Sequence, residues 1–143
     1  MKKILKTLID YSLFEKYDKD YFINNKILPL FENDISIKMA VCKNSKLETI
    51  KNDFNKVISF LEIDELELLF MISHIDQKTL LYSMALKAIS QNSFEKYVDK
   101  FLQELLSFSI NLRASDIHIE QYKDVILFKF RIDGRLKTFF AFK

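Results

Sequence analysis

The spacing of apolar residues over positions 1–90 predicts a small region that mixes helices and strands. Residues 12–24 carry apolar side chains at close to helical spacing, which predicts one short polar helix. The stretches 27–32 and 35–43 predict two strands that form a hairpin through an Asn33–Asp34 turn. Because proline cannot donate a backbone hydrogen bond to a neighbouring strand, Pro29 predicts either an edge position or the start of a strand.

The same region is expected to continue with further helices and one more strand. The periodicity predicts a helix over 46–56, a strand over 57–63, and helices over 64–73 and 76–90. Asn44 or Ser45 is expected to cap the first of these helices and Asp64 the second, because short polar side chains accept hydrogen bonds from the unpaired amides at a helix start. Residues 1–90 are therefore expected to form one small α+β domain.

A polar segment from Gln91 to Ser93 separates two apolar-periodic runs and marks the expected domain boundary. A long helix is expected over 93–114, followed by strands over 115–120, 125–133 and 135–142. Asp133 and Gly134 are a strong hairpin signal, since glycine adopts positive φ without strain. Residues 91–143 thus begin a second domain, a helix followed by part of an antiparallel sheet. The helix face expected to be buried consists of Phe94, Val98, Phe101, Leu102, Leu105, Leu106 and Ile110.

Composition and charge narrow the classes of protein that this sequence can belong to. With 49% hydrophobic and 29% charged residues, the 143-residue chain resembles an ordinary folded protein. Its formal net charge of +2 is too small to indicate binding to nucleic acid or to an anionic membrane. Cys42 is the one cysteine and is expected to be a small core residue rather than a reactive thiol. No apolar run could span a bilayer, and Lys6 and Asp10 interrupt the N-terminal run, so we expect a cytoplasmic protein without a signal peptide.

Residue types that carry catalysis are sparse. His74 and His118 lie far apart in the sequence, and with one cysteine they complete no metal-ligand spacing, so no metal site is expected. A chain with one glycine cannot form a glycine-rich phosphate loop, which excludes both a P-loop and a dinucleotide fingerprint. We therefore expect no catalytic residues in this chain and do not expect it to be an enzyme by itself.

The arginines are unevenly placed. Three of the 22 basic residues are arginines, namely Arg113, Arg131 and Arg135, and all three fall near the C-terminus. A guanidinium group presents a planar fork of donors that matches a carboxylate or a phosphate, which a lysine ammonium group cannot reproduce. The grouping directs attention to this region, and chance clustering is the alternative.

Two blocks in this region carry a resemblance to a known family. They are Arg-Ala-Ser-Asp-Ile-His-Ile-Glu at 113–120 and Phe-Arg-Ile-Asp-Gly at 130–134. With the amphipathic helix before them, they resemble the signature of the ATPases of type II secretion, type IV pilus assembly and related competence systems. The resemblance implies that residues 91–143 begin the PAS-like second N-terminal domain of such an ATPase. Residues 1–90 are more loosely similar to the preceding domain, which docks the ATPase onto an inner-membrane platform.

The resemblance also implies what the whole protein contains. The RecA-like motor of a hexameric ATPase, with its sites for ATP and Mg²⁺, would lie beyond Lys143, so this chain would be a non-catalytic docking and regulatory region. It would be either a cut piece of such an ATPase or a short relative that has lost the motor. Some relatives bind cyclic di-GMP through an Arg-Leu-Gly motif on an early helix, and this sequence has no Arg or Gly before Arg113 to match that motif.

Carried over residue by residue, the resemblance gives Arg131 the role of contacting a nucleotide phosphate held by the motor domain. Arg135 and Asp116 are candidate supporting residues. The alternative is that Arg131 pairs with Asp116 or Glu120 on the neighbouring strand. His118 is expected to be a hydrogen-bonded structural residue rather than a ligand. The other motif positions are Arg113, Ser115, Asp133 and Gly134, while Lys129 stands where the family often has arginine and Gln121 where it usually has proline.

The expected partners are an inner-membrane platform protein, the protein's own motor domain and neighbouring subunits of a hexamer, and no nucleic acid. The protein would then be cytoplasmic and peripheral to the inner membrane.

The hairpin over 125–142, with Phe139, Phe140 and Phe142, is expected to leave an apolar face and an edge uncovered, which predicts dimerisation or strand exchange through 115–142. The alternative function is a stand-alone adaptor without a motor. Whether a motor would serve secretion, pilus extension or DNA uptake stays open.

Overall fold

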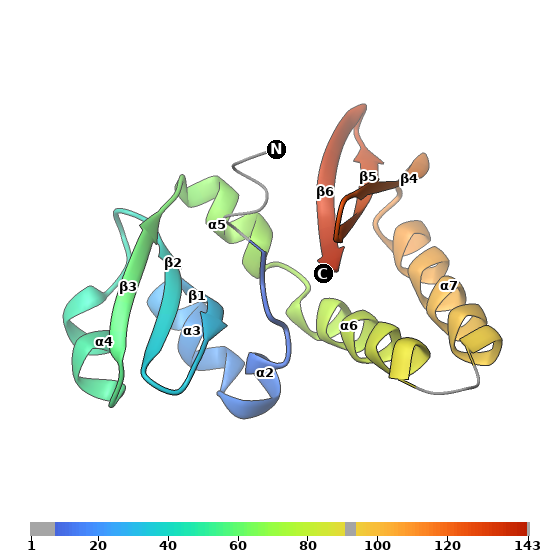
Figure 1. The fold of residues 1–143 in the computed structure, drawn as a ribbon. Helices are drawn as coiled ribbons and strands as arrows, with labels where there is room; N and C mark the ends of the chain where they lie inside the picture. The colour runs from blue at the N-terminus through green and yellow to red at the C-terminus, as the bar shows by residue number, and fades with distance from the viewer. Residues whose placement is uncertain (1–7, 91–93, 143) are drawn as a thin grey trace. The chain divides into compact units, whose positions relative to one another are not determined.

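The computed structural model describes residues 8–90 and 94–142, apart from the side chain of Phe94. Its described part is an α+β fold with two separate three-stranded sheets (Figure 1). The chain divides into two compact units, Met1–Ile75 and Asp76–Lys143. The boundary expected at residues 91–93 lies outside the described residues, and the contacts assign residues 76–90 to the second unit.

The first unit builds its sheet in the order β1–β2–β3. β1 and β2 pair as an antiparallel hairpin, which confirms the expected one, and β3 joins β2 in parallel. β1 is an outer strand, and its register shifts between Pro29 and Phe31, so Pro29 occupies the edge position that the sequence predicts. The elements of this unit are α2 (Leu13–Lys16), α3 (Lys19–Asn25), β1 (Ile27–Glu32), β2 (Ser36–Val41), α4 (Leu47–Asp53), β3 (Val57–Glu62) and α5 (Glu65–Ile72).

The single helix expected over 12–24 was wrong, because the structure divides it into α2 and α3. Tyr17 has an extended backbone, and Asp18 starts α3 by accepting a hydrogen bond from the amide of Asp20. A residue that caps a new helix cannot continue the previous one, since its own backbone is not helical. The turn also places the rings of Tyr17 and Phe22 in an edge-to-face contact, with centroids 6.0 Å apart.

The two predicted helix caps have different outcomes. Asp64 caps α5 as expected and accepts hydrogen bonds from the amides of Leu66 and Glu67. The cap predicted for α4 was wrong, because the residue at its N-cap position is Lys46, with no side-chain hydrogen bond. Ser45 instead accepts from the Cys42 amide at 2.9 Å and donates to the carbonyl of Lys26. It therefore fastens the end of β2 to the start of β1.

The core of the first unit lies between the sheet and helices α3 and α4. Cys42 is also buried, in agreement with its expected place in the core. The central side chains are Phe22, Ile27, Ile37, Met39, Val41 and Ile50, and the rings of Phe14, Tyr17, Tyr21 and Phe54 pack against them. α5 packs against β1 and β2.

The second unit is an antiparallel sheet in the order β4–β5–β6 together with two helices (Figure 1). Its elements are α6 (Ile75–Ser90), α7 (Phe94–Asn111), β4 (Asp116–Tyr122), β5 (Val125–Ile132) and β6 (Arg135–Phe142). Asp133 and Gly134 have φ angles of 49° and 74°, which confirms the predicted hairpin turn. Ser93, a candidate cap for α7, lies outside the described residues.

Aromatic side chains fill the space between the second sheet and its helices. Phe101 and Phe108 of α7 contact Phe128 and Phe130 of β5, with centroids 5.3 and 6.3 Å apart respectively. The ring of Tyr82 in α6 contacts the rings of Phe140 and Phe142 in β6. The prediction that Phe139, Phe140 and Phe142 lie uncovered was wrong, since they are 3%, 1% and 8% exposed. A register shift opposite Phe128 and Lys129 lets the successive residues Phe139 and Phe140 both contact rings of β5.

The buried face of α7 differs from the expected one. Phe101, Leu105 and Phe108 are buried, whereas Leu102, Leu106 and Ile110 are 39%, 54% and 72% exposed. The sequence pattern predicts a broad apolar face. The packed face is narrower, because the contacts of α7 with β5 and β6 run through Phe101 and Phe108.

Candidate functional site

The two blocks that carry the family resemblance lie on neighbouring strands. Antiparallel pairing of β4 with β5 sets Asp116 opposite Arg131 and His118 opposite Lys129. Because side chains alternate between the two faces of a strand, these four residues share one face of the sheet. This polar face of β4 and β5 is the candidate functional site.

The ion pair between Arg131 and Asp116 is central to this face. Arg131 Nε lies 3.0 Å from Asp116 Oδ2 and 3.3 Å from Oδ1, and both side chains are about two-fifths exposed. Ser115 Oγ donates to Asp116 Oδ2 at 2.7 Å, and His118 Nε2 lies 2.5 Å from Oδ1. The hydrogen bond from Ser115 lowers the pKa of Asp116, with further lowering by His118 and Arg131 against the opposing effect of desolvation. Asp116 is therefore held as a carboxylate.

A second carboxylate cluster lies further along the same face. Lys129 Nζ is 2.5 Å from Glu120 Oε2, and the Tyr122 hydroxyl donates to the same oxygen at 2.6 Å. These two hydrogen bonds lower the pKa of Glu120, that of Lys129 contributing most. Of the two partners that the sequence left open for Arg131, the structure shows Asp116, while Glu120 is paired with Lys129.

The structure does not bring all the predicted site residues together. Arg135 pairs with Ile132, the neighbour of Arg131, so the alternation of a strand puts Arg135 on the opposite face. Arg113 has a left-handed backbone with a φ of 55°, and its amide donates to the carbonyl of Ile110 at 2.9 Å. It thus ends α7 in the manner of a helix C-cap. Asp133 and Gly134 form the turn after Arg131.

The geometry leaves Arg131 able to contact an anion. Its hydrogen bonds to Asp116 both use Nε, so among the described hydrogen bonds its two terminal nitrogens donate none. Those nitrogens form the fork that binds phosphate or carboxylate through two parallel hydrogen bonds. No group of three His, Cys, Asp or Glu side chains in the described residues could hold a metal ion.

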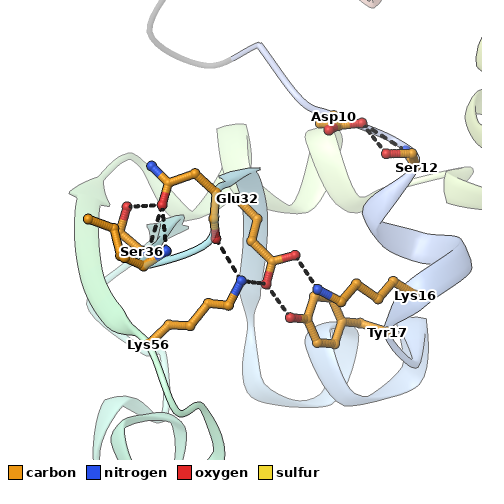
Figure 2. Close-up of polar contacts among 9 residues, drawn as sticks. Asp10, Ser12, Lys16, Tyr17, Glu32, Ser36 and Lys56 are labelled. Carbon is orange, nitrogen blue, oxygen red and sulfur yellow. Dashed lines mark hydrogen bonds and ion pairs between the residues drawn. The ribbon is translucent and has the colours of Figure 1, made fainter.

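A polar cluster in the first unit was missed by the sequence reasoning. Figure 2 shows Lys16, Tyr17 and Lys56 converging on Glu32, whose side chain is 7% exposed. Lys16 Nζ and Lys56 Nζ lie 2.6 and 3.1 Å from its carboxylate oxygens, and the hydroxyl of Tyr17 donates to it. Desolvation raises the pKa of Glu32, but the three hydrogen bonds outweigh it and lower the pKa to about 2. The cluster ties α2 and the start of β3 to the end of β1.

A buried lysine was also missed, although the sequence contains a signal for it. Lys78 is 1% exposed, and its Nζ lies 4.5 Å from the centroid of the Phe139 ring. It stands three residues after Ile75 and three before Leu81, both buried, so it occupies an apolar position of the helical pattern. Desolvation lowers the pKa of Lys78 to about 7.

Comparison with known proteins does not identify this chain. No protein-family model and no curated protein matches its sequence. Across the described helices, none has the length and apolar character needed to cross a bilayer.

Proposed function

We propose that this chain is the N-terminal docking and regulatory region of a hexameric ATPase that drives type II secretion, type IV pilus assembly or DNA uptake. The observation that supports it most is the pairing of the two resembling blocks. Residues 113–120 and 130–134, separated in the sequence, meet on β4 and β5 with Asp116 opposite Arg131. Two sequence blocks that form one site in the folded chain can act together on one ligand, which is what the proposed role requires.

Arg131 acts in this proposal as a sensor of nucleotide held by the motor domain. Asp116 fixes the guanidinium group through Nε at 3.0 Å, and Ser115 and His118 hold Asp116 in turn. The two terminal nitrogens then point their donors at a phosphate as a preoriented fork. Such a fork matches the charge and geometry of a nucleotide phosphate better than a lysine does. ATP and Mg²⁺ belong to the motor in this proposal, and this chain does not hydrolyse ATP.

The first unit recruits the motor to a platform protein at the inner membrane. Exposed aliphatic side chains suited to such docking gather at one end of its sheet. Ile35 and Val57 are 75% and 71% exposed, and a backbone hydrogen bond of 3.0 Å from the Val57 amide to the Ile35 carbonyl joins their segments. The protein is cytoplasmic and reaches the membrane surface through this partner.

The test measures ATP turnover in the native full-length protein, whose size is first established by intact mass spectrometry from its own cells. Arg131→Ala is expected to lower turnover strongly, while Arg135→Ala, on the opposite face of the same hairpin, serves as the matched control. Equal ATP turnover in both variants and wild type would show that Arg131 does not act as a nucleotide sensor. Turnover by purified residues 1–143 would contradict their non-catalytic role.

A stand-alone adaptor is the second candidate, and the half-exposed ion pair between Arg131 and Asp116 is the observation that favours it. In that case the pair serves strand pairing alone. A native product with the mass of the 143-residue chain would support the adaptor, whereas a product several times heavier would support the ATPase.

A further inference from the structure

β4 has neither the register shift nor the proline, lysine or arginine that protects β6 and β1 against pairing. It is an outer strand of its sheet within the described part of the chain, and its register with β5 is unbroken from Asp116 to Tyr122. The opposite outer strand, β6, has a register shift and carries Arg135 and Lys137, and β1 has Pro29 and a shift of its own. Bulges, prolines and charged side chains, lysine above all, are the usual devices that keep a sheet edge from pairing with another strand.

The backbone groups available along β4 follow from its hairpin with β5. Lys123 and Asp124 form a two-residue turn between Tyr122 and Val125. In a hairpin with such a turn, the two flanking residues form a hydrogen-bonded pair. Hydrogen-bonded and non-hydrogen-bonded pairs then alternate, so Glu120 and His118 also direct their backbone groups at β5. The amides and carbonyls of Ile117, Ile119 and Gln121 therefore point to the outer edge.

The side chains of β4 complement those of a second β4 in one antiparallel register. With Ile119 opposite Ile119 of the second copy, all seven residues of the strand are paired. His118 then faces Glu120, and Asp116 faces Tyr122, each twice by symmetry. A basic or hydrogen-bonding side chain thus meets a carboxylate at every polar pair, and no like charges stand opposite each other. Ile119 is 56% exposed in the single chain, and this pairing covers it with an identical side chain.

We propose that two copies of this chain associate through β4, antiparallel and centred on Ile119, to form one continuous six-stranded sheet. The interface has twofold symmetry, because the same residues face each other from both sides. Backbone hydrogen bonds at Ile117, Ile119 and Gln121 supply the association, and the pairing of His118 with Glu120 selects the register. This inference does not depend on the proposed ATPase function.

The first experiment measures the molar mass of the 143-residue chain by light scattering and analytical ultracentrifugation over a wide concentration range. Wild type is expected to reach a dimer. Ile119→Lys should raise the dissociation constant at least about tenfold, because two like charges then stand directly opposite. Leu66→Lys, which changes another exposed aliphatic residue in the first unit, should dimerise as wild type does. The proposal would be overturned if wild type stayed monomeric at every concentration. It would also be overturned if Ile119→Lys left the dimer unchanged while circular dichroism showed both variants folded.

The second experiment tests the register by disulfide formation. Residues 118 and 120 of opposite copies form a non-hydrogen-bonded pair about 4.5 Å apart at Cα, within disulfide range. Residue 118 and its own symmetry mate lie on a diagonal of about 7–8 Å, beyond that range. A mixture of His118→Cys and Glu120→Cys should therefore cross-link under mild oxidation, and each variant alone should not. Cys42 is buried, and wild type gives the background. Equal cross-linking of the single variants and the mixture would overturn this register.

Discussion

Asp116 and Arg131 stand directly opposite each other on β4 and β5, and their side chains form an ion pair of 3.0 Å between Arg131 Nε and Asp116 Oδ2. The contact uses the inner nitrogen of the guanidinium group and leaves the outer fork to other acceptors. Pairing across the strands and contact with a phosphate are therefore compatible roles for Arg131. The first role orients the side chain, and the second would use that orientation.

Arg131→Ala should have little effect on the stability of the isolated chain. The ion pair is nearly two-fifths exposed on both sides, and exposed pairs contribute little because water screens them. Its urea unfolding midpoint should stay close to that of Arg135→Ala. Phe130→Ala, in the same strand, removes a fully buried ring and should lose roughly 3–5 kcal/mol. A loss from Arg131→Ala that approached the loss from Phe130→Ala would make Arg131 a structural residue.

Glu32→Gln should destabilise the first unit by roughly 2 kcal/mol, the usual size of a hydrogen bond to a charged group. The neutral amide keeps the shape of Glu32 but loses the charge that holds Lys16 and Lys56 around it. Chemical denaturation followed by fluorescence of the tyrosines measures this change. Glu48→Gln, an exposed position on α4, is the control and should match wild type.

Glu32→Gln should also reduce the loss of unfolding free energy that occurs when the pH is lowered. The folded pKa of Glu32 is about 2, below the ordinary value of 4.5, so the folded state favours the carboxylate. Its contribution is complete above about pH 4.5 and is lost as the pH falls through 4.5 toward 2. The difference in unfolding free energy between wild type and Glu32→Gln should therefore shrink steadily over this range. A difference that stayed constant down to pH 2 would show that charge is not what stabilises the cluster.

Truncation of two neighbouring leucines of α7 should have very different effects on the free energy of unfolding. Leu105 is 2% exposed and Leu106 is 54% exposed. Leu105→Ala should cost about 2–5 kcal/mol because it leaves a cavity against the sheet, while Leu106→Ala should stay within about 0.5 kcal/mol of wild type. Thermal unfolding of both variants measures the contrast. Equal losses would mean that the broad apolar face expected from the sequence is buried after all.

Local patterns predicted most of the fold because most of its elements are specified locally. The Asp133–Gly134 turn, the cap at Asp64 and the edge position of Pro29 each depend on residues adjacent in sequence, and the structure confirms all three. The partner of Arg131 could not be chosen in this way. It depends on the strand register, which the two-residue turn at Lys123 and Asp124 sets.

Contacts between distant segments escaped the sequence reasoning for a physical reason. Lys16 lies in α2, Glu32 in β1 and Lys56 just before β3, and no spacing rule relates these three residues before the chain is folded. The buried face of α7 was misjudged for a similar reason. A helical pattern shows which side chains are apolar, but the packed partner decides how many of them are covered. Leu106 and Ile110 belong to the pattern and remain exposed.

Lys78 should make the second unit more stable as the pH rises above neutrality. Burial lowers its folded pKa to about 7, whereas an unfolded lysine keeps a pKa near 10.4, so the unfolded chain binds more protons between these values. Stability should thus rise by up to about 1.4 kcal/mol per pH unit over part of this window and level off above it. Lys78→Met keeps a long apolar side chain and removes the titration, so its stability should be nearly flat from pH 7 to 10. Lys87→Met, near the end of the same helix and exposed, is the control that should keep the wild-type rise. Urea unfolding measures the free energy of unfolding at each pH. If it changed with pH in the same way for wild type and Lys78→Met, Lys78 would not lose its proton on folding.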